Sequence, residues 1–204
     1  MKKQFFDIVR KELFSNTLNQ LQVEGLEFIL DYYESQSEIK DIKQLAYILG
    51  TIHHETGATM QPIEEWGKGK GKPYAKRIDV DRSPYSDTLN IFFGRGYTQN
   101  TWRTIYIKLT KANTRAWDFF NNPELLLEKE PSIWATFYAM KTGLYTGRKL
   151  SDYDLFNDSV LELDRNSPIF GLPKWYNVRK TVNALDKAEK IANISRIYLK
   201  ALTA

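Results

Sequence analysis

Apolar residues recur at helical spacing in three segments near the start of the chain. The spacing predicts helices over residues 4–14, 18–34 and 38–56, separated by polar residues that end one helix and can cap the next. The third segment has the densest apolar pattern, and its polar face is thin after Gln44. We therefore expect a central helix that is buried on most sides, and Gly57 follows it in the position that a helix C-cap prefers.

The rest of the chain alternates loops with shorter predicted helices. Residues 58–90 look irregular because they are rich in glycine, lysine and proline, and so long a connection in a compact domain is usually functional. Residues 167–177 predict a second loop, and at most one strand is expected, near Asn90–Phe93. Further helices are expected over residues 98–111, 123–127, 131–143, 151–165 and 184–202. The pattern predicts a mainly α protein with a single domain over residues 1–204, in which residues 1–37 pack on the remainder.

Composition sets limits on the chemistry. Of 204 residues, 42% are hydrophobic, enough for a core, and 14% are aromatic, which also suits stacking on sugar rings. The net charge of +4 is a mild bias toward anionic partners, but the lysines form no organised basic helix, so we expect no nucleic-acid partner. The absence of cysteine excludes disulfides, thiolate zinc sites and a cysteine nucleophile.

Neither a membrane span nor a signal peptide is expected. Asp7 and Arg10 interrupt the apolar run at the N-terminus too early for a signal peptide. No stretch approaches the ~18 apolar residues that a membrane span needs. We therefore expect a protein made in the cytoplasm that depends on other machinery if it acts outside it.

Metal and nucleophile chemistry fit the sequence poorly. Both histidines, His53 and His54, adjoin Glu55, but neighbouring helical residues point ~100° apart and cannot all face one ion. The H-E-x-x-H spacing is missing because position 58 is alanine, and no G-x-S-x-G run is present. The Gly-Lys run over residues 67–73 lacks the spacing of a phosphate-binding loop. We expect no metal and no cofactor.

Paired carboxylates remain as candidate chemistry. Glu55 lies at the end of the predicted buried helix, where desolvation favours a neutral carboxyl that can donate a proton. Glu64 and Glu65 follow in a loop, where a solvated carboxylate stays ionised and can act as a base. Acetal cleavage with inversion needs such a pair ~6.5–9.5 Å apart, and the chain length between them permits that separation.

Four segments, in order, resemble glycoside hydrolase family 19, which holds chitinases and related bacteriophage endolysins. Residues 46–56 (AYILGTIHHET) resemble its catalytic helix, and residues 93–102 (FGRGYTQNTW) resemble its aromatic-G-R-G-aromatic-x-Q-x-[ST]-W run. Residues 118–125 (DFFNNPEL) are similar to a segment of the endolysin branch, and residues 179–188 to the late R-x-x-V-N-G-x-D-x-A motif. The resemblance implies a lysozyme-like helical fold of two lobes with a central cleft.

The resemblance also implies a catalytic set. Glu55 matches the family's general acid. Glu64 matches the base of the endolysin form, and Glu65 is the next candidate for the base or a substrate contact. Thr101 matches the hydroxyl that helps hold the attacking water.

Further residues match the family's substrate contacts. His54 matches a substrate-side histidine beside the acid, and Gln99 and Asn183 match polar groups that hydrogen-bond the sugars and their acetamido arms. Tyr97 and Trp102 match aromatic residues near the cleft, although core packing is an equal alternative for both.

The chain departs from the family pattern at two positions. Ala184 replaces the glycine after the late asparagine, and Ile105 stands where an asparagine is common, which puts one sugar contact in doubt. Arg95 and Arg179 are expected to be ion-pair partners of the glutamates rather than substrate contacts. The absence of disulfides and the short loops point to the bacterial and phage branch.

The resemblance therefore predicts a monomeric glycosidase of the lysozyme and chitinase type, with one catalytic domain and no separate cell-wall-binding domain. Its expected partner is the β-1,4 glycan backbone of peptidoglycan, cleaved by an inverting two-carboxylate mechanism in the bacterial cell wall. Release by a holin, for an endolysin, or delivery by a secretion machine, for an antibacterial effector, would bring it there. Chitin is the alternative substrate, and an inactive glycan-binding module is the alternative from another class.

Overall fold

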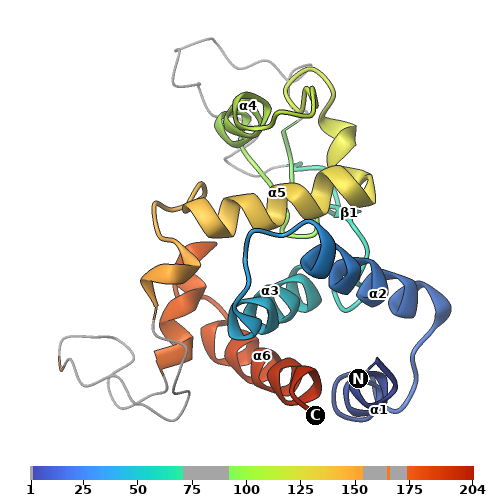
Figure 1. Ribbon diagram of the computed structural model, residues 1–204. Helices are drawn as coiled ribbons and strands as arrows, with labels where there is room; N and C mark the ends of the chain where they lie inside the picture. The colour runs from blue at the N-terminus through green and yellow to red at the C-terminus, as the bar shows by residue number, and fades with distance from the viewer. Residues whose placement is uncertain (1, 71–91, 154–164, 166–173) are drawn as a thin grey trace.

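The computed structural model describes residues 2–70, 92–153, 165 and 174–204 (Figure 1). Helices dominate this part of the chain, and a small antiparallel sheet joins two distant segments. In chain order the elements are α1 (Lys2–Leu13), α2 (Gln20–Ser35), α3 (Ile42–Glu55), β1 (Ile63–Glu64), β2 (Arg95–Gly96), α4 (Arg103–Ala112), η3 (Pro123–Leu127), α5 (Lys129–Thr142), η4 (Leu150–Asp152), η5 (Lys174–Thr181) and α6 (Ala188–Leu202), where η marks a 3-10 helix.

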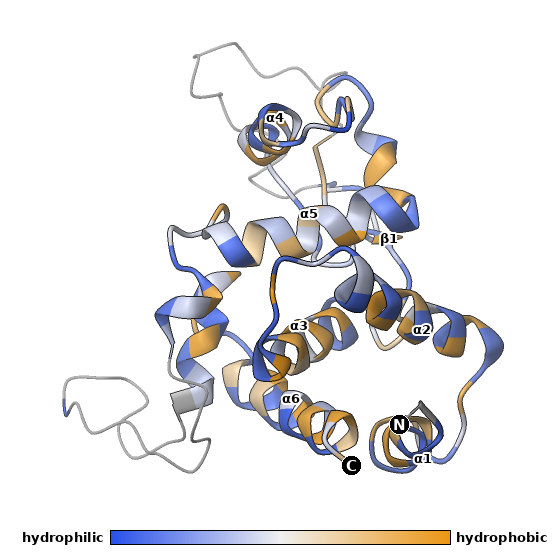
Figure 2. Ribbon diagram, in the orientation of Figure 1, coloured by the Kyte–Doolittle hydropathy of each residue, from blue (hydrophilic) through white to orange (hydrophobic). Residues whose placement is uncertain are grey.

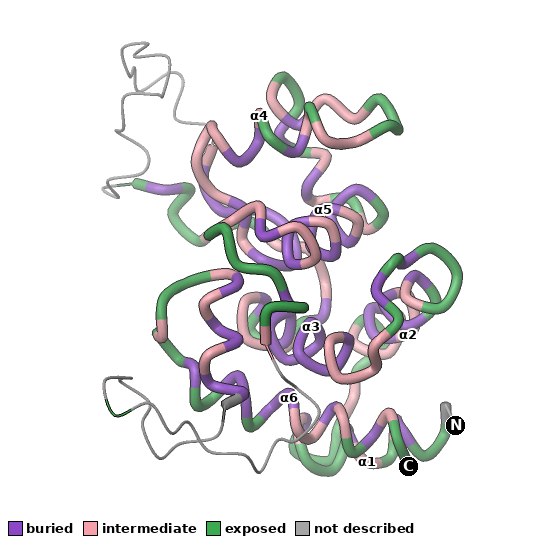
Figure 3. The backbone as a smooth tube through the Cα atoms, turned by 60° about the vertical axis from the view of Figure 1, so that its left-hand side comes forward, coloured by how far each residue is buried: buried purple, intermediate pink, exposed green. Residues whose placement is uncertain are grey.

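Helix α3 is the central element, as its apolar pattern predicted. Every residue from Leu45 to His53 is buried, and Figure 3 shows α3 inside the molecule with α1 at its edge. The helix begins later than predicted because the Asp41 carboxylate caps it, accepting a hydrogen bond from the Lys43 N–H at 2.8 Å. It ends at Glu55, one residue before the predicted end, and Gly57 with φ of +58° follows the C-cap residue Thr56.

Helix α6 packs closely along α3, and helix α1 packs against the other side of α6. At the closest approach, a Cβ added to Gly50 would lie 2.0 Å from the Ser195 hydroxyl, so only glycine fits there. Helix α1 shows alternating hydrophilic and hydrophobic stretches in Figure 2. It contributes Phe5 to the core beside Tyr198, and its buried residues continue the same hydrophobic cluster as α2, α3 and α6.

A second hydrophobic cluster forms around α4, η3 and the loop between them. Its buried members include Tyr106, Phe119 and Leu126. Helix α5 lies between the two clusters: Ile133 and Phe137 belong to the first, while Ala135 belongs to the second. The described chain thus has two lobes that share one helix.

The two-residue sheet fixes the segment after α3 against the segment before α4. Ile63 pairs with Gly96 and Glu64 pairs with Arg95. The predicted strand near Asn90–Phe93 is wrong for its described residues, because Phe92 stacks on Phe120 in the second cluster instead of pairing in a sheet.

Two further predicted helix starts are wrong. Helix α4 was expected from residue 98, but Gln99 and Trp102 have φ of +51° and +73°, which a helix does not allow, so it begins at Arg103. Helix α6 was expected from residue 184 and begins at Ala188, after Lys187 with φ +57°. Helix α5 confirms its prediction within two residues, and Gly143 (φ +75°) ends it.

The loop predicted over residues 167–177 is wrong at its end, since residues 174–177 open the 3-10 helix η5. Residues 167–173 of that loop lie outside the described part of the chain, as do residues 71–90 of the loop over 58–90. Of the helix predicted over residues 151–165, only 151–153 and 165 are described, and residues 151 and 152 belong to η4.

Candidate active site

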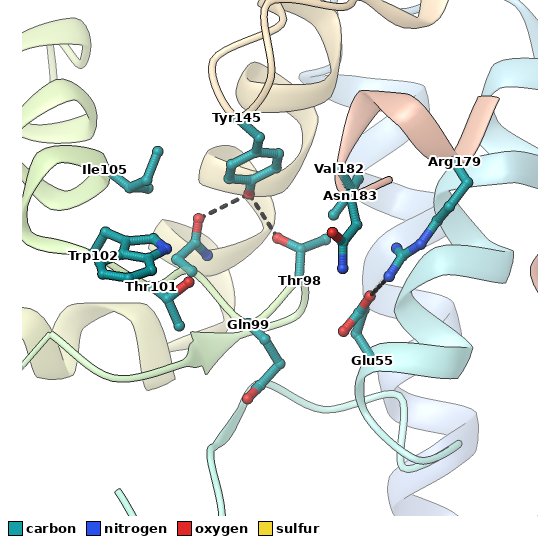
Figure 4. Close-up of a pocket in the computed structure, with 11 residues that line it drawn as sticks. Glu55, Thr98, Gln99, Thr101, Trp102, Ile105, Tyr145, Arg179, Val182 and Asn183 are labelled. Atoms are coloured by element: carbon teal, nitrogen blue, oxygen red, sulfur yellow. Dashed lines mark hydrogen bonds and ion pairs between the residues drawn. The ribbon is translucent and has the colours of Figure 1, made fainter. Parts of the chain in front are cut away.

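A pocket of about 350 Å³ opens where the two lobes meet (Figure 4). One wall of the pocket is formed by Glu55, at the end of α3, and by a segment that begins in η5. The opposite wall is formed by the loop between β2 and α4. The lining residues are Glu55, Thr98, Gln99, Asn100, Thr101, Trp102, Ile105, Tyr145, Arg179, Val182 and Asn183. Most of them carry hydroxyl, amide or charged groups, so the pocket suits a polar ligand rich in hydrogen-bonding groups.

The Glu55 carboxylate is held by Arg179 at 2.8 Å, as Figure 4 shows. The Arg179 side chain is only 3% exposed, and its Nε donates to the Asp186 carbonyl at 3.0 Å. Glu55 keeps 17% exposure, on the pocket side. A nearly buried guanidinium therefore fixes the position of a carboxylate that a ligand can still reach. The expected ion pair between Arg179 and a candidate glutamate is confirmed.

The loop after β2 places three amide and hydroxyl side chains on the opposite wall. Gln99 donates from Nε2 to the Ile63 carbonyl at 3.0 Å and to the Gly96 carbonyl at 3.3 Å. This ties the loop to the sheet, and the next two residues, Asn100 and Thr101, also line the pocket. The positive φ values at Gln99 and Trp102, which delay the start of α4, belong to this turn.

A hydroxyl network that the sequence did not indicate forms the back of the pocket. The Tyr145 hydroxyl donates to Asn100 Oδ1 at 2.8 Å and lies 2.7 Å from Thr98 Oγ1. A phenol has one proton to give, so Thr98 donates to Tyr145. Burial raises the pKa of Tyr145 and keeps the phenol neutral. Tyr145, which follows the end of α5, could not be found from spacing because it lies 45 residues from Asn100.

The two loop glutamates take different positions beside the pocket, and neither is among its lining residues. Glu64 is exposed and pairs with Lys68 at 3.3 Å. Glu65 is half-buried: its backbone N–H donates to the Gly94 carbonyl at 2.7 Å, and its carboxylate accepts from the Gly94 N–H at 3.2 Å. Strand geometry explains the difference, because successive side chains point to opposite faces.

Contacts at Gly94 connect Glu65 to the pocket wall. A Cβ added to Gly94 would lie 2.7 Å from Gln99 Oε1, 3.3 Å from the Glu65 Cβ and 3.4 Å from Thr101 Cγ2. Glu65 therefore packs on the same glycine as two residues that line the pocket.

The two histidines differ in burial but neither lines the pocket. His53 lies in the core, with Nδ1 3.0 Å from the Tyr198 hydroxyl and its ring against Phe14. Burial lowers its pKa from 6.5 to about 4. His54 is half-buried; burial lowers its pKa, and the nearby Glu55 carboxylate partly opposes this effect.

The aromatic candidates are split between core and pocket. Tyr97 is fully buried in the first cluster, and its N–H donates to the Ser132 hydroxyl at 3.0 Å, so it is placed to pack rather than to touch a ligand. Trp102 lines the pocket beside Ile105, which forms an apolar patch where the family pattern has an amide. Arg95 is buried, and its guanidinium pairs with Glu124 at 2.8 Å.

Within residues 2–70, 92–153, 165 and 174–204, no cluster of three or more histidine and acidic side chains is suited to hold a metal ion. In the same described part, no helix has both the length and the apolar character to cross a membrane. The pocket therefore offers a fixed carboxylate that faces hydroxyl and amide groups, and two further carboxylates lie nearby, Glu64 at the end of β1 and Glu65 directly after it.

Comparison with known proteins identifies proteins that share the fold of this chain at low sequence identity. No model of a known protein family matches the chain, and no curated protein sequence matches it. Chitinase C from Streptomyces griseus HUT6037 has a similar structure, with a TM-score of 0.50 and 17% identity over 72% of this chain and 68% of that chain.

Two other solved structures are also similar. A bacterial family 19 chitinase has a TM-score of 0.46 and 20% identity, over 70% of this chain and 67% of that chain. A mutant of chitinase C has a TM-score of 0.43 and 21% identity, over 69% of this chain and 53% of that chain. At such identities the likeness concerns the fold. The prediction of a lysozyme-like, two-lobed helical fold of the family 19 chitinase type is confirmed.

Proposed function

We propose that this protein is a glycoside hydrolase that cleaves the β-1,4 glycan backbone of peptidoglycan. The position of Glu55 carries the proposal: its carboxylate ends a buried helix, reaches a pocket and is fixed by Arg179 at 2.8 Å. The facing amide and hydroxyl groups suit the hydroxyl and acetamido groups of an amino sugar. The fold shared with chitinase C supports a glycan substrate.

In the proposed reaction, protonated Glu55 donates its proton to the glycosidic oxygen as the bond from that oxygen to C1 breaks. A carboxylate at position 64 or 65 takes a proton from a water molecule, and the water oxygen bonds to C1 from the opposite face. The Thr101 hydroxyl holds this water, and Gln99 and Asn183 bind the flanking sugars. The products are a free hydroxyl on one sugar and an inverted hemiacetal on the other.

Different observations support the two candidates for the base. The motif match supports Glu64, whose exposed carboxylate is paired with Lys68. Packing supports Glu65, because it shares the Gly94 contact with Gln99 and Thr101, which line the pocket.

Clearing of a turbid suspension of permeabilised bacterial cells tests the proposal. We expect Glu55→Gln to lower the rate by about 10²–10⁴-fold, the usual contribution of a general acid. Glu34→Gln, on the exposed face of α2, is the matched control and should clear at the normal rate. Full clearing by Glu55→Gln would exclude the assignment, and binding to the wall without released fragments would favour the inactive glycan-binding module.

Glu64→Gln and Glu65→Gln, assayed side by side, identify the base. The variant that lacks the base should lose at least about 10²-fold in rate, whereas the other should change mainly KM. If both retain full kcat, the base lies elsewhere and the two-carboxylate mechanism is wrong.

Chitin is the second candidate substrate, favoured by the chitinases that share the fold. The net charge of +4 instead favours an anionic wall polymer over neutral chitin. Mass analysis of the fragments released from each polymer separates the two and identifies the bond that is cut. Product from chitin and none from peptidoglycan would overturn the proposed substrate while leaving the reaction type intact.

A further inference from the structure

Trp66 is the most exposed large apolar side chain among the described residues. It is 101% exposed, and Leu21, the next, is 60% exposed. One exposed apolar residue is ordinary and needs no explanation by itself. The position of Trp66 in the fold and the charged residues that follow it in the chain indicate a binding role for this indole.

Trp66 lies two residues after β1, which pairs with the segment that leads into the pocket wall. The preceding residue, Glu65, is hydrogen-bonded through both its N–H and its carboxylate to Gly94, at 2.7 and 3.2 Å. A Cβ added to Gly94 would in turn meet Gln99 and Thr101, which line the pocket. Because consecutive Cα atoms are about 3.8 Å apart, the indole is anchored within one residue of a fixed point beside the pocket.

The turn that follows Trp66 is held by backbone hydrogen bonds and presents positive charge. The Lys68 N–H donates to the Glu65 carbonyl at 3.0 Å, and the Lys70 N–H donates to the Gly67 carbonyl at 2.9 Å. Both lysines are exposed. The Lys68 ammonium forms an ion pair with the Glu64 carboxylate at 3.3 Å, and it lies 5.9 Å from the centre of the Phe93 ring. The turn therefore carries an exposed indole at position 66 and exposed ammonium groups at positions 68 and 70.

We propose that Trp66, Lys68 and Lys70 form an outlying surface that binds the same peptidoglycan strand whose neighbouring sugars occupy the pocket. This rests on the proposed function. The indole face stacks on the C–H face of a sugar ring, and the lysines attract the carboxylates of muramic acid and its peptide stem.

Two observations favour a glycan over a lipid surface. Glu65, the residue before Trp66, is hydrogen-bonded to Gly94 beside the pocket wall, so one extended strand can reach both the indole and the pocket. A lipid surface is usually bound by an amphipathic helix with several apolar side chains, and here a single indole is exposed on a turn, with one of its two lysines already paired to Glu64.

Binding to insoluble peptidoglycan sacculi, measured in the cold by depletion of protein from solution, tests the proposal. We expect Trp66→Ala to weaken binding about tenfold, equivalent to about 1.4 kcal/mol, and Trp66→Tyr to keep most of the affinity. Leu21→Ala is the matched control, since it removes the other large exposed apolar side chain, and it should bind normally. Lys68→Gln with Lys70→Gln should make binding less sensitive to salt.

Unchanged binding by Trp66→Ala would overturn the proposal, and so would an equal loss with Leu21→Ala. Binding of the wild-type chain to anionic phospholipid vesicles, lost in Trp66→Ala while sacculus binding is kept, would assign the surface to a membrane instead. Fragment release by the wild-type chain is measured separately. A failure of the outlying surface is therefore distinguishable from a failure of the proposed hydrolysis.

Discussion

At the scale of single residues, the pocket is organised by one ion pair between segments far apart in the chain. Glu55 ends α3, and Arg179 comes from η5, more than a hundred positions later. A charge that is nearly buried is costly unless it is paired, so the two residues stabilise each other's position. The family resemblance named Glu55, and both Arg95 and Arg179 were expected to pair with the candidate glutamates, whereas the roles of Tyr145 and Asn100 came only from the fold.

Removal of the Arg179 charge should destabilise the protein. We expect Arg179→Met to lower the free energy of unfolding by about 3 kcal/mol, because Glu55 would be left without its countercharge in a mostly buried place. Arg10→Met is the control: its pair with Asp7 is solvent-exposed and should contribute less than about 1 kcal/mol. Urea denaturation measures both, and equal losses would contradict the role assigned to Arg179.

His53 should make stability depend on pH. The folded protein keeps His53 neutral down to about pH 4, whereas the unfolded chain takes up its proton near pH 6.5. The unfolded state therefore binds more protons between these values. The free energy of unfolding should fall as pH drops from 6.5 to 4, by up to about 3 kcal/mol, and this contribution should level off below pH 4.

Denaturation at several pH values measures this effect. The His53→Gln variant, which keeps a polar group near Tyr198, should show a shallower decline over the same window. An identical slope in the variant would mean that other groups cause the acid sensitivity.

At the scale of secondary-structure elements, α3 and α6 are held together by a close approach that propensity alone would not favour. Glycine inside a helix costs about 1 kcal/mol relative to alanine. Gly50 is kept in α3 because Ser195 of α6 fills the space that a side chain would need. Glu55 is placed by the C-terminal end of this same helix, so the packing of α3 on α6 also positions the pocket.

Gly50→Ala should destabilise the protein by about 1–3 kcal/mol, as overpacking does, although alanine is the better helix former. Ser195→Gly in the same chain removes the obstructing hydroxymethyl group and should recover part of the loss. A double-mutant cycle by thermal unfolding measures the coupling. Additive effects of the two substitutions would show that the contact does not limit the helix spacing.

At the scale of the whole molecule, the pocket exists because two hydrophobic clusters meet along α5. Trp134 and Tyr145 pack against both clusters. The ion pair is fixed on the side of α3 and η5, and the amide and hydroxyl groups on the side of the loop after β2. A shift of one lobe would therefore separate the proposed acid from the groups that face it.

The shared helix should make the described lobes unfold together. Trp117 and Trp134 pack in or against the second cluster and Trp175 lies in the first, so tryptophan fluorescence reports on both clusters. We expect fluorescence and far-ultraviolet circular dichroism to give one coincident transition in denaturant. Two separated transitions would show that the lobes are independent.

The sequence by itself determined the elements whose signals are local. Apolar spacing located α3 and α5, Gly57 and Gly143 marked their ends, and an ordered set of short motifs identified Glu55 and the pocket residues Gln99, Thr101, Trp102 and Asn183. The helix predictions succeeded because helical periodicity and capping depend on residues within one or two turns, whereas the roles of the motif residues stay predictions.

Only the tertiary structure decided which candidates meet. It placed His53 and Tyr97 in the core, separated the exposed Glu64 from the half-buried Glu65, and brought Tyr145 to Asn100. Spacing along the chain carries no information on such contacts, because long-range packing and positive φ values at Gln99 and Trp102 set them. The sequence thus specifies the residue types that the site uses. The packing of the two lobes determines which of those residues share the pocket.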